Sequence, residues 1–327
     1  MRAAVVTEPG GPEVLEVHDV EEPTPGPDDL LVAVKATALN RADLLQRAGR
    51  YPGPRGVRSD VPGLEMAGVV AGVGDRVVGY AEGDRVFGLL GGGGYAERVV
   101  THHAMVARIP ERLGYEEAAS IPEVFFTAYD ALFNWCGLAI GDRVLIHAAG
   151  SGVGVAAIQL ARTAGAFSFG TAGSSVKLAK AADLGLNVGI DYHVDDFQQV
   201  VERETGGEGV NVILDVIGAP YWERNLASMA VRGHMVLVGS LGGGKLETSI
   251  AALMPKRLTV HGTVLRARAV EEKIALTNQF KRHVLPLIEA GSLAPVVDRV
   301  FPLADAAEAH RYMESNANFG KIVLAVG

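Results

Sequence analysis

The segment from Ala149 to Gly154 has the residue types and spacing that bind a phosphate group. It follows an apolar run, Val144 to Ala148, and precedes small helix-forming residues up to Ala161. Small residues let the backbone close on a pyrophosphate while helix amides and the positive end of the helix dipole face it. The context predicts a dinucleotide-binding turn, and the alternative is an ordinary glycine-rich connection. The candidate binding residues are Ala149, Ser151, Gly152, Val153 and Gly154.

Ser151 stands at a position of this turn that is often held by glycine. Its hydroxyl could contact a phosphate, or its side chain could limit how closely the backbone approaches. About twenty residues further on, an NAD site would carry an acidic side chain for the ribose hydroxyls. Here Ser174 and Lys177 are present instead, and they suit a 2′-phosphate through hydrogen bonds and charge. The pattern favours NADPH, unless Lys177 and Lys180 only form the solvated face of a helix.

The first 120 or so residues predict a β-rich module, because short apolar runs alternate with prolines and glycines. One helix interrupts these strands, with Asn40 as its N-cap. The expected strands are Arg2 to Val6, Val14 to Val20, Leu30 to Ala38, Met66 to Val73, Arg85 to Leu89 and Tyr95 to Val100.

From about Pro122 apolar strands alternate with amphipathic stretches, which is typical of an α/β fold with a doubly wound parallel Rossmann sheet. The expected strands are Arg143 to Ala148, Phe167 to Gly170, Val188 to Asp191, Val212 to Val216 and Met235 to Gly239. Beyond residue 270 we expect a helix, a strand at Val296 to Phe301, a helix at Ala304 to Glu314 and a strand at Lys321 to Val326.

These last elements do not extend the parallel sheet easily, so we assign them to the first module. The predicted domains are residues 1–122 with 271–327 for catalysis, and residues 123–270 for the nucleotide, with ligands in the cleft between them.

The composition excludes several classes of function. The chain has 327 residues, a mass of 34.3 kDa, a net charge of -8 and a pI near 5.6, which argue against a nucleic-acid partner. No apolar run reaches the ~18 residues of a membrane span. Cys136 is the one cysteine, so no internal disulfide is possible. The first residues lack a secretory pattern, and we expect a cytoplasmic protein.

With these residues identified, the chain resembles the zinc-independent quinone oxidoreductases of the medium-chain dehydrogenase/reductase superfamily. The resemblance covers essentially the whole chain. It implies a GroES-like (chaperonin-10-like) catalytic domain, a homodimer and no metal. Zinc-using relatives carry His before Glu where this chain has Leu64 before Glu65, and they carry a cysteine in the region of Leu39 and Asn40. The matching segments are Gly10 to Val17, Ala38 to Tyr51, Pro62 to Gly68, the phosphate turn and Gly320 to Leu324.

The resemblance also implies the catalytic residues: Asn40, Asp43, Tyr51 and Thr127 should lie near the nicotinamide. Tyr51 is the preferred donor to polarise the substrate. In the alternative interpretation Asp43 caps its helix and Tyr51 packs on the turn at Pro52 to Pro54. An ion pair of Asp43 with Arg41 or Arg47 is plausible from their spacing.

On the cofactor side the resemblance places Tyr192 near the adenosine and Leu265 with Arg266 beside the nicotinamide. The alternative for Arg266 is a solvated loop. Lys321 could meet a ribose or a phosphate, and the strand near Leu258 to Val260 is the expected dimer contact. The remaining expected cofactor residues are Ser240 and Asn316.

The neutral residue types of the expected pocket suit an acceptor that becomes a stable anion on taking hydride, because no histidine or lysine stands ready as a proton relay. Quinones fit this description, so NADPH-dependent quinone reduction is the first hypothesis. Reduction of the C=C bond of an enone or enoyl thioester is the second. A nucleotide-binding protein without catalysis is the third, and the fold alone does not separate the three.

Overall fold

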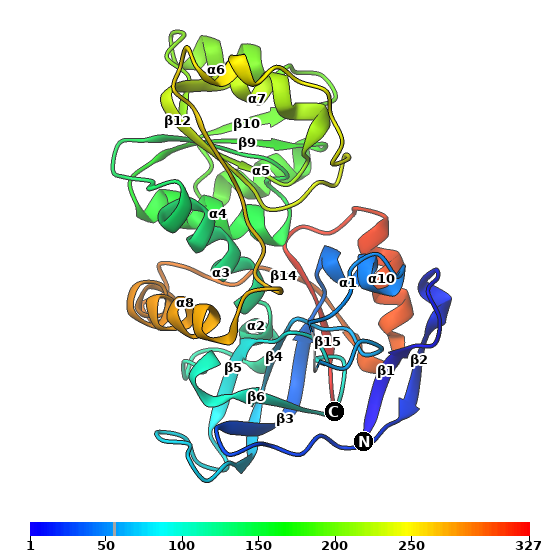
Figure 1. Ribbon diagram of the computed structural model, residues 1–327. Helices are drawn as coiled ribbons and strands as arrows, with labels where there is room; N and C mark the ends of the chain where they lie inside the picture. The colour runs from blue at the N-terminus through cyan, green and yellow to red at the C-terminus, as the bar shows by residue number, and fades with distance from the viewer. Residues whose placement is uncertain (55–56) are drawn as a thin grey trace. The chain divides into compact units, whose positions relative to one another are not determined.

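The computed structural model describes residues 1–54 and 57–327 and divides them into two compact units (Figure 1). Unit 1 comprises Met1–Phe126 and Leu265–Gly327, and unit 2 comprises Thr127–Val264. The carboxyl-terminal segment therefore belongs to the same unit as the amino-terminal one. No helix in the described ranges combines the length and the apolar character that crossing a bilayer requires.

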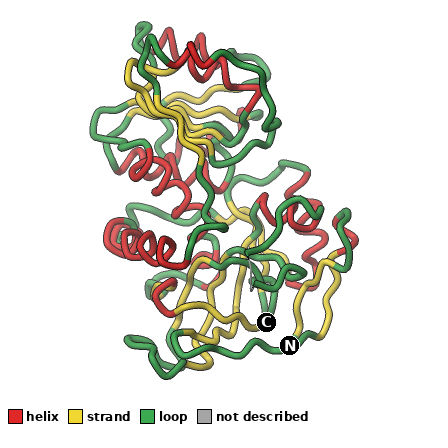
Figure 2. The backbone as a smooth tube through the Cα atoms, in the orientation of Figure 1, coloured by secondary structure: helices red, strands yellow, loops and turns green. Residues whose placement is uncertain are grey.

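Unit 1 is built on a seven-stranded sheet in the order β14-β15-β3-β4-β5-β7, with β6 paired to β3, and on a separate β1-β2 pair (Figure 2). The strands are β1 (Arg2–Val6), β2 (Leu15–Asp19), β3 (Asp29–Ala38), β4 (Glu65–Val73), β5 (Arg85–Leu89), β6 (Arg98–His102), β7 (Val106–Arg108), β14 (Val297–Pro302) and β15 (Lys321–Ala325).

The central strand β3 explains why this sheet holds together. Its residues alternate between buried and partly exposed positions over most of its length, and it pairs antiparallel with β15, β4 and β6. Leu30, Val32 and Val34 project into the core of unit 1. The expected strand at Tyr95 to Val100 begins too early, because β6 starts at Arg98 and the backbone of Tyr95 bonds to Pro62 and Ala4 outside the seven-stranded sheet.

The helices of unit 1 join and cover these strands. Asn40 is the N-cap of α1, as the sequence predicts. The helices are α1 (Arg41–Arg47), α2 (Tyr115–Ala119), α3 (Pro122–Tyr129, which continues into unit 2), α8 (Val270–His283), α9 (Leu285–Glu289) and α10 (Ala306–Glu314).

Unit 2 holds a six-stranded, wholly parallel sheet in the order β10-β9-β8-β11-β12-β13, which confirms the predicted doubly wound fold. Its strands are β8 (Arg143–Ile146), β9 (Phe167–Ala172), β10 (Val188–Asp191), β11 (Val210–Asp215), β12 (Met229–Leu237) and β13 (Thr259–Gly262). The order reverses between β8 and β11, and loops at the carboxyl ends of strands beside such a reversal are where these sheets bind ligands.

Helices lie on both faces of this sheet. Figure 1 shows α6 and α7 on one face and α4 on the other. The residues between the sheet and α6 are large and apolar, with Phe169, Ile190, Phe197 and Ile213 all fully buried. The helices are α4 (Gly152–Thr163), α5 (Ser175–Asp183), α6 (Phe197–Glu204) and α7 (Trp222–Ser228).

Candidate active site

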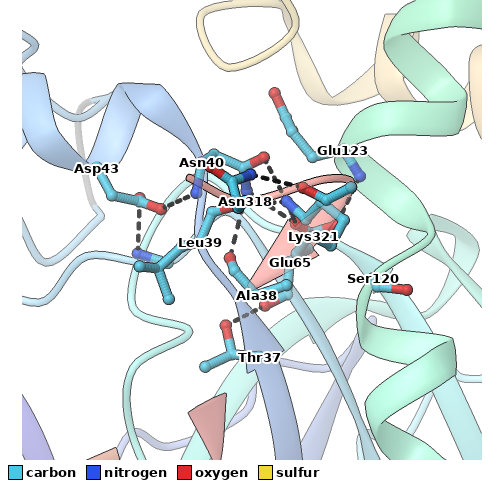
Figure 3. A network of polar contacts seen from close by, with 12 residues as sticks. Thr37, Ala38, Leu39, Asn40, Asp43, Glu65, Ser120, Glu123, Asn318 and Lys321 are labelled. Carbon is cyan, nitrogen blue, oxygen red and sulfur yellow. Dashed lines mark hydrogen bonds and ion pairs between the residues drawn. The ribbon is translucent and has the colours of Figure 1, made fainter. Parts of the chain in front are cut away.

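A buried ion pair lies at the centre of unit 1, between Glu65 at the start of β4 and Lys321 at the start of β15 (Figure 3). Their exposed side-chain fractions are 0% and 4%. The Lys321 ammonium donates to Glu65 Oε1 at 2.7 Å, to Asn40 Oδ1 at 2.7 Å and to the Leu39 carbonyl at 2.6 Å. An ammonium has three hydrogens. Lys321 therefore has no donor left for a ribose or a phosphate, which corrects the expected cofactor contact.

The side chain of Asn40 is held by the same pair. Its amide nitrogen donates to Glu65 Oε1 at 2.8 Å and to the Ala38 carbonyl at 3.3 Å, and its oxygen accepts from Lys321. Both amide hydrogens are thus engaged within the protein. In this arrangement neither amide hydrogen of Asn40 is free for a substrate, and its place near the nicotinamide stays a prediction.

Asp43 is fully buried and also turns inward. Its carboxylate accepts from the Asn40 backbone N–H at 2.7 Å, from the Gly63 N–H at 3.2 Å and from the Tyr95 hydroxyl at 3.1 Å. Burial raises the pKa of Asp43 to about 6. The bond to Asn40 ties down the first turn of α1, as the alternative interpretation has it. The expected ion pair with Arg47 is replaced by one between Arg47 and Glu314.

Tyr51 and Arg266 form a second polar pair of unit 1, in which the tyrosine is the more accessible partner. Tyr51 is half-buried, and the Arg266 guanidinium lies 5.1 Å from the centre of its ring. Arg266 is itself 4% exposed and donates to the carbonyls of Gly91 and Tyr51 and to Gln46 Oε1 at 2.8, 3.1 and 2.7 Å. Arg266 is therefore no solvated loop residue. Its guanidinium fixes the ring of Tyr51 by a cation–π contact.

The hydroxyl of Tyr51 has no hydrogen-bond partner among the residues that the structure describes. Burial and, next, the charge of Glu123 raise the pKa of this phenol. Tyr51 therefore stays protonated at neutral pH and keeps its O–H available as a donor.

Glu123 is a functional candidate that sequence reasoning missed. It stands in the first turn of α3, where an acidic residue is common because of the helix dipole, so nothing in the sequence distinguishes it. Its backbone N–H donates to Glu65 Oε2 at 2.8 Å. Burial and the neighbouring Glu65 raise the pKa of Glu123 to about 8. We name Glu65, Lys321, Asn40 and Glu123 the acid–ammonium cluster. Thr127, also half-buried, follows Glu123 by one turn of the same helix.

The residues of this region do not fit a zinc ion. Zinc needs three or four nitrogen, sulfur or oxygen ligands that converge on it. Leu64 occupies a buried position beside Glu65, and both oxygens of Glu65 already accept hydrogen bonds. Over residues 1–54 and 57–327, no group of three or more His, Cys, Asp or Glu side chains is arranged to hold a metal.

In unit 2 the turn after β8 has the geometry of a phosphate site. Ala148 adopts a left-handed φ of 54°, and Ser151 is the N-cap of α4, with its hydroxyl accepting from the Gly154 N–H at 3.0 Å. A Cβ on Gly154 would lie 2.4 Å from the Ala148 carbonyl oxygen, so only glycine fits there. Gly152 and Val153 begin the helix, and Ala149 is fully buried behind the turn. These features fit a bound pyrophosphate.

The structure brings Tyr192 to the turn between β9 and α5, where Ser174 and Lys177 lie. A Cβ on Gly173 would lie 2.4 Å from the Tyr192 hydroxyl, and the Tyr192 N–H donates to the Ala172 carbonyl at 3.2 Å. Ser174 is the N-cap residue of α5, and Lys177 is in its first turn. All three expected residues thus share one end of the sheet.

The other expected cofactor residues are dispersed. Ser240 is exposed after β12 and lies against Gly218, which follows β11. Leu265 is buried and belongs to unit 1, as Arg266 does. Asn316, exposed at the end of α10 with a left-handed φ of 55°, accepts a hydrogen bond from Arg41.

A second buried network was also missed, and it lies beneath the phosphate turn. His147 hydrogen-bonds Thr171 Oγ1 through Nδ1 at 3.0 Å and Asn225 Oδ1 through Nε2 at 2.7 Å. Asn225 in turn donates to Asp215 Oδ2 at 3.0 Å. Burial lowers the pKa of His147 to about 4, so its imidazole is neutral near pH 7. We name His147, Thr171, Asn225 and Asp215 the imidazole network.

Comparison with known proteins agrees with both units. Residues 26–111 match the family described as alcohol dehydrogenase GroES-like domain, and residues 184–324 match the family described as zinc-binding dehydrogenase. The chain is 34% identical to a quinone oxidoreductase from Lama guanicoe, over 99% of this chain and 97% of that protein.

Two solved structures extend the likeness to the whole fold. One, described as an NAD-dependent alcohol dehydrogenase, is 38% identical with a TM-score of 0.90 and covers 100% of both chains. The other, Escherichia coli quinone oxidoreductase complexed with NADPH, is 29% identical with a TM-score of 0.89, over 99% of this chain and 100% of that one. The GroES-like unit, the Rossmann sheet and the full-length identity show that this chain belongs to the quinone oxidoreductase family of the medium-chain dehydrogenase/reductase superfamily.

Proposed function

We propose that the protein is an NADPH-dependent quinone reductase that works without a metal. The observation that carries this proposal is the accessible hydroxyl of Tyr51, which has no hydrogen-bond partner among the described residues, whereas Asn40, Asp43 and Lys321 have their polar groups engaged. Family membership supports it, and so does the relative from Escherichia coli, whose structure contains NADPH. Bound NADPH supplies the hydride that the acceptor takes up.

The residues of unit 2 would hold the cofactor by its charged groups. The turn from Ala149 to Gly154 presents the start of α4 to the pyrophosphate. Ser174 and Lys177 bind the 2′-phosphate, and Tyr192, which is 45% exposed beside them, covers the adenosine. Ser240 contacts the cofactor from the neighbouring loop.

The residues of unit 1 would hold and polarise the acceptor. The Tyr51 hydroxyl donates a hydrogen bond to the acceptor oxygen, and Arg266 keeps the ring in place. A quinone spreads the charge of the added hydride over its ring, so one neutral donor stabilises the product anion. A simple ketone would give a localised alkoxide, which needs a metal or a strong acid.

We further propose that the protein is a cytoplasmic homodimer. In the described sheet of unit 2, β13 is an edge strand paired only with β12. An unpaired edge favours addition of the same strand from a second copy across a two-fold axis. Light scattering of the purified protein would give a mass near twice 34.3 kDa, and a value near 34.3 kDa would contradict the dimer.

The decisive experiment is a steady-state panel of quinones, enones, enoyl thioesters and alcohols with NADPH and NADH. We expect turnover of ortho- and para-quinones with NADPH, and Tyr51→Phe should lower kcat by roughly 10- to 100-fold if the hydroxyl polarises the acceptor. If an enoyl thioester were turned over in preference to quinones, reduction of its C=C bond would become the proposed activity. Oxidation of alcohols as the leading activity would overturn the proposal.

Zinc independence has its own test, since the family that residues 184–324 of this chain match is described as zinc-binding dehydrogenase. Exhaustive chelation should leave quinone turnover unchanged, with metal analysis to verify that zinc has been removed. Activity that is lost and then restored by zinc alone would contradict it.

A further inference from the structure

The proposed reduction needs a proton as well as a hydride. Asn40, Asp43 and Lys321 have every polar hydrogen or acceptor engaged inside unit 1. The phenol of Tyr51 can donate a hydrogen bond, but its raised pKa makes it a poor source of a free proton. The remaining candidate in this neighbourhood is Glu123.

Glu123 is anchored by its backbone while its side chain stays unengaged. The Glu123 N–H is fixed to Glu65 Oε2 at 2.8 Å. Figure 3 shows the carboxyl directed away from the Glu65–Lys321 pair. Among the residues that the structure describes, this carboxyl has no hydrogen-bond partner. The side chain is half-buried, so it is shielded from water on part of its surface and reachable on the rest.

Burial first, and then the negative charge of Glu65, favour the protonated form of Glu123. Glu65 and Asp43 face it with negative charge, whereas Lys321 and Lys273 face it with positive charge. However, the three hydrogens of Lys321 are used by Glu65, Asn40 and Leu39, and Lys273 donates to the Arg266 carbonyl at 2.7 Å. The pair Glu65–Lys321 is thus internally neutral. A second carboxylate beside it lacks a direct counter-ion and takes up a proton instead.

Glu123 also lies within electrostatic reach of the proposed acceptor site. Its charge acts on Tyr51, whose pKa it raises after the effect of burial, and it acts on Arg266 in the opposite sense to burial. Tyr51 and Arg266 are in direct contact through the ring and the guanidinium. The carboxyl of Glu123 therefore lies close enough to Tyr51 and Arg266 in unit 1 for its charge to act on both side chains.

We propose that Glu123 is the catalytic proton donor of this reduction, which rests on the proposed function. The quinone takes a hydride from the reduced nicotinamide and becomes a hydroquinone monoanion. The O–H bond of the Glu123 carboxyl breaks, and an O–H bond forms on the anionic oxygen of the product. Glu123 is left as a carboxylate, and water returns its proton before the next turnover. One quinone, one hydride and one proton thus give one hydroquinone.

The test compares the wild type with Glu123→Gln, Glu123→Asp and the control Glu111→Gln, which makes the same change at an exposed glutamate of unit 1. We expect the wild-type kcat/KM for a quinone to fall as the pH rises through about 8. Glu123→Gln should lower kcat roughly 100-fold or more and abolish this fall. Glu123→Asp should restore part of the rate together with the pH dependence, and Glu111→Gln should match the wild type.

A second readout does not depend on turnover. The infrared difference between the wild type and Glu123→Gln should show the carbonyl stretch of a protonated carboxyl at neutral pH, and this band should vanish above about pH 8. Absence of the band, or a Glu123→Gln enzyme with wild-type rate and pH profile, overturns the proton donor while leaving quinone reduction intact. Loss of quinone turnover in the wild type itself overturns the proposed function, and with it this role.

Discussion

Each of the two units buries a polar network, and the two networks differ in charge. The acid–ammonium cluster of unit 1 contains the ion pair Glu65–Lys321 and a carboxyl that holds a proton. The imidazole network of unit 2 is built around His147, whose ring is neutral at pH 7 and hydrogen-bonded on both nitrogens. The acid–ammonium cluster thus joins opposite charges in an ion pair, whereas the imidazole network contains no cation and links the neutral His147 ring through Asn225 to the Asp215 carboxyl.

Removing the ammonium should give the largest effect on stability. Lys321→Met leaves Glu65 buried without its counter-ion, which should lower the free energy of unfolding by about 3–5 kcal/mol. The double variant Glu65→Gln/Lys321→Met should recover much of this loss, because no uncompensated charge remains. Denaturant unfolding measures the change, and amide exchange in β4 assigns it to unit 1. A loss below ~1 kcal/mol for Lys321→Met would show that the pair contributes little.

The sequence predicted local features of both networks but not the networks themselves. The turn at Ala149 to Gly154 and the N-cap at Asn40 follow from short-range residue patterns, and the structure has both. Asn40, in contrast, meets Glu65 across 25 positions, and Lys321 meets Glu65 across 256. A single chain gives no signal for such pairings, because each residue type is also common on surfaces.

The different partner of Lys321 has the same origin. The resemblance implied that Lys321 could meet a ribose or a phosphate, and an ammonium is equally suited to a buried carboxylate. Arg266 could have been solvated, and only the carbonyls of Gly91 and Tyr51, far away in the sequence, show that it is enclosed.

The two networks should respond to pH in opposite directions. The pKa of Glu123 rises from 4.5 to about 8 on folding, so its contribution to stability is present below pH 4.5 and is lost as the pH rises through about 8. The pKa of His147 falls from 6.5 to about 4, so its contribution is present above pH 6.5 and is lost as the pH falls through about 4.

These signs can be read from variants. The unfolding free energy of the wild type minus that of Glu123→Gln should decrease as the pH rises toward about 8. The unfolding free energy of the wild type minus that of His147→Gln should decrease as the pH falls toward about 4. Burial also lowers the pKa of His310, to about 3. His310 titrates in the wild type and in each variant, so its contribution cancels when the two unfolding free energies are subtracted. Amide exchange should place the first difference in unit 1 and the second in unit 2. If both free-energy differences changed in the same direction with pH, the contrast between the two networks would be contradicted.

Variants of Lys177 test whether unit 2 binds the 2′-phosphate of NADPH through a charged side chain near its surface. Lys177→Ala should weaken NADPH binding by about 1–3 kcal/mol, the range of a charge-assisted hydrogen bond, and should leave NADH binding nearly unchanged. Lys180→Ala, one turn further along α5, is the control and should affect neither cofactor. Titration calorimetry with both cofactors measures the difference. Equal losses for NADPH and NADH would remove the argument for a 2′-phosphate contact.

The smallest expected effect concerns Ser151, which differs from the glycine often found in this turn. Its hydroxyl accepts from the Gly154 N–H at 3.0 Å and so caps α4. Ser151→Ala should lower the free energy of unfolding by about 1 kcal/mol, whereas Ser151→Gly should cost only a few tenths, because glycine is a tolerable N-cap.

The same two variants separate the possible roles of the hydroxyl toward the cofactor. If Ser151 serves only as the cap, Ser151→Gly frees the Gly154 N–H to face the pyrophosphate and removes a side chain from its approach. We therefore expect Ser151→Gly to bind NADPH at least as tightly as the wild type, measured by calorimetry. Equal weakening in Ser151→Ala and Ser151→Gly would mean that the hydroxyl itself contacts the phosphate. In that case Ser151 would bind the pyrophosphate through its side chain, as we propose for Ser174 and Lys177 with the 2′-phosphate, and the backbone of the turn would not act alone.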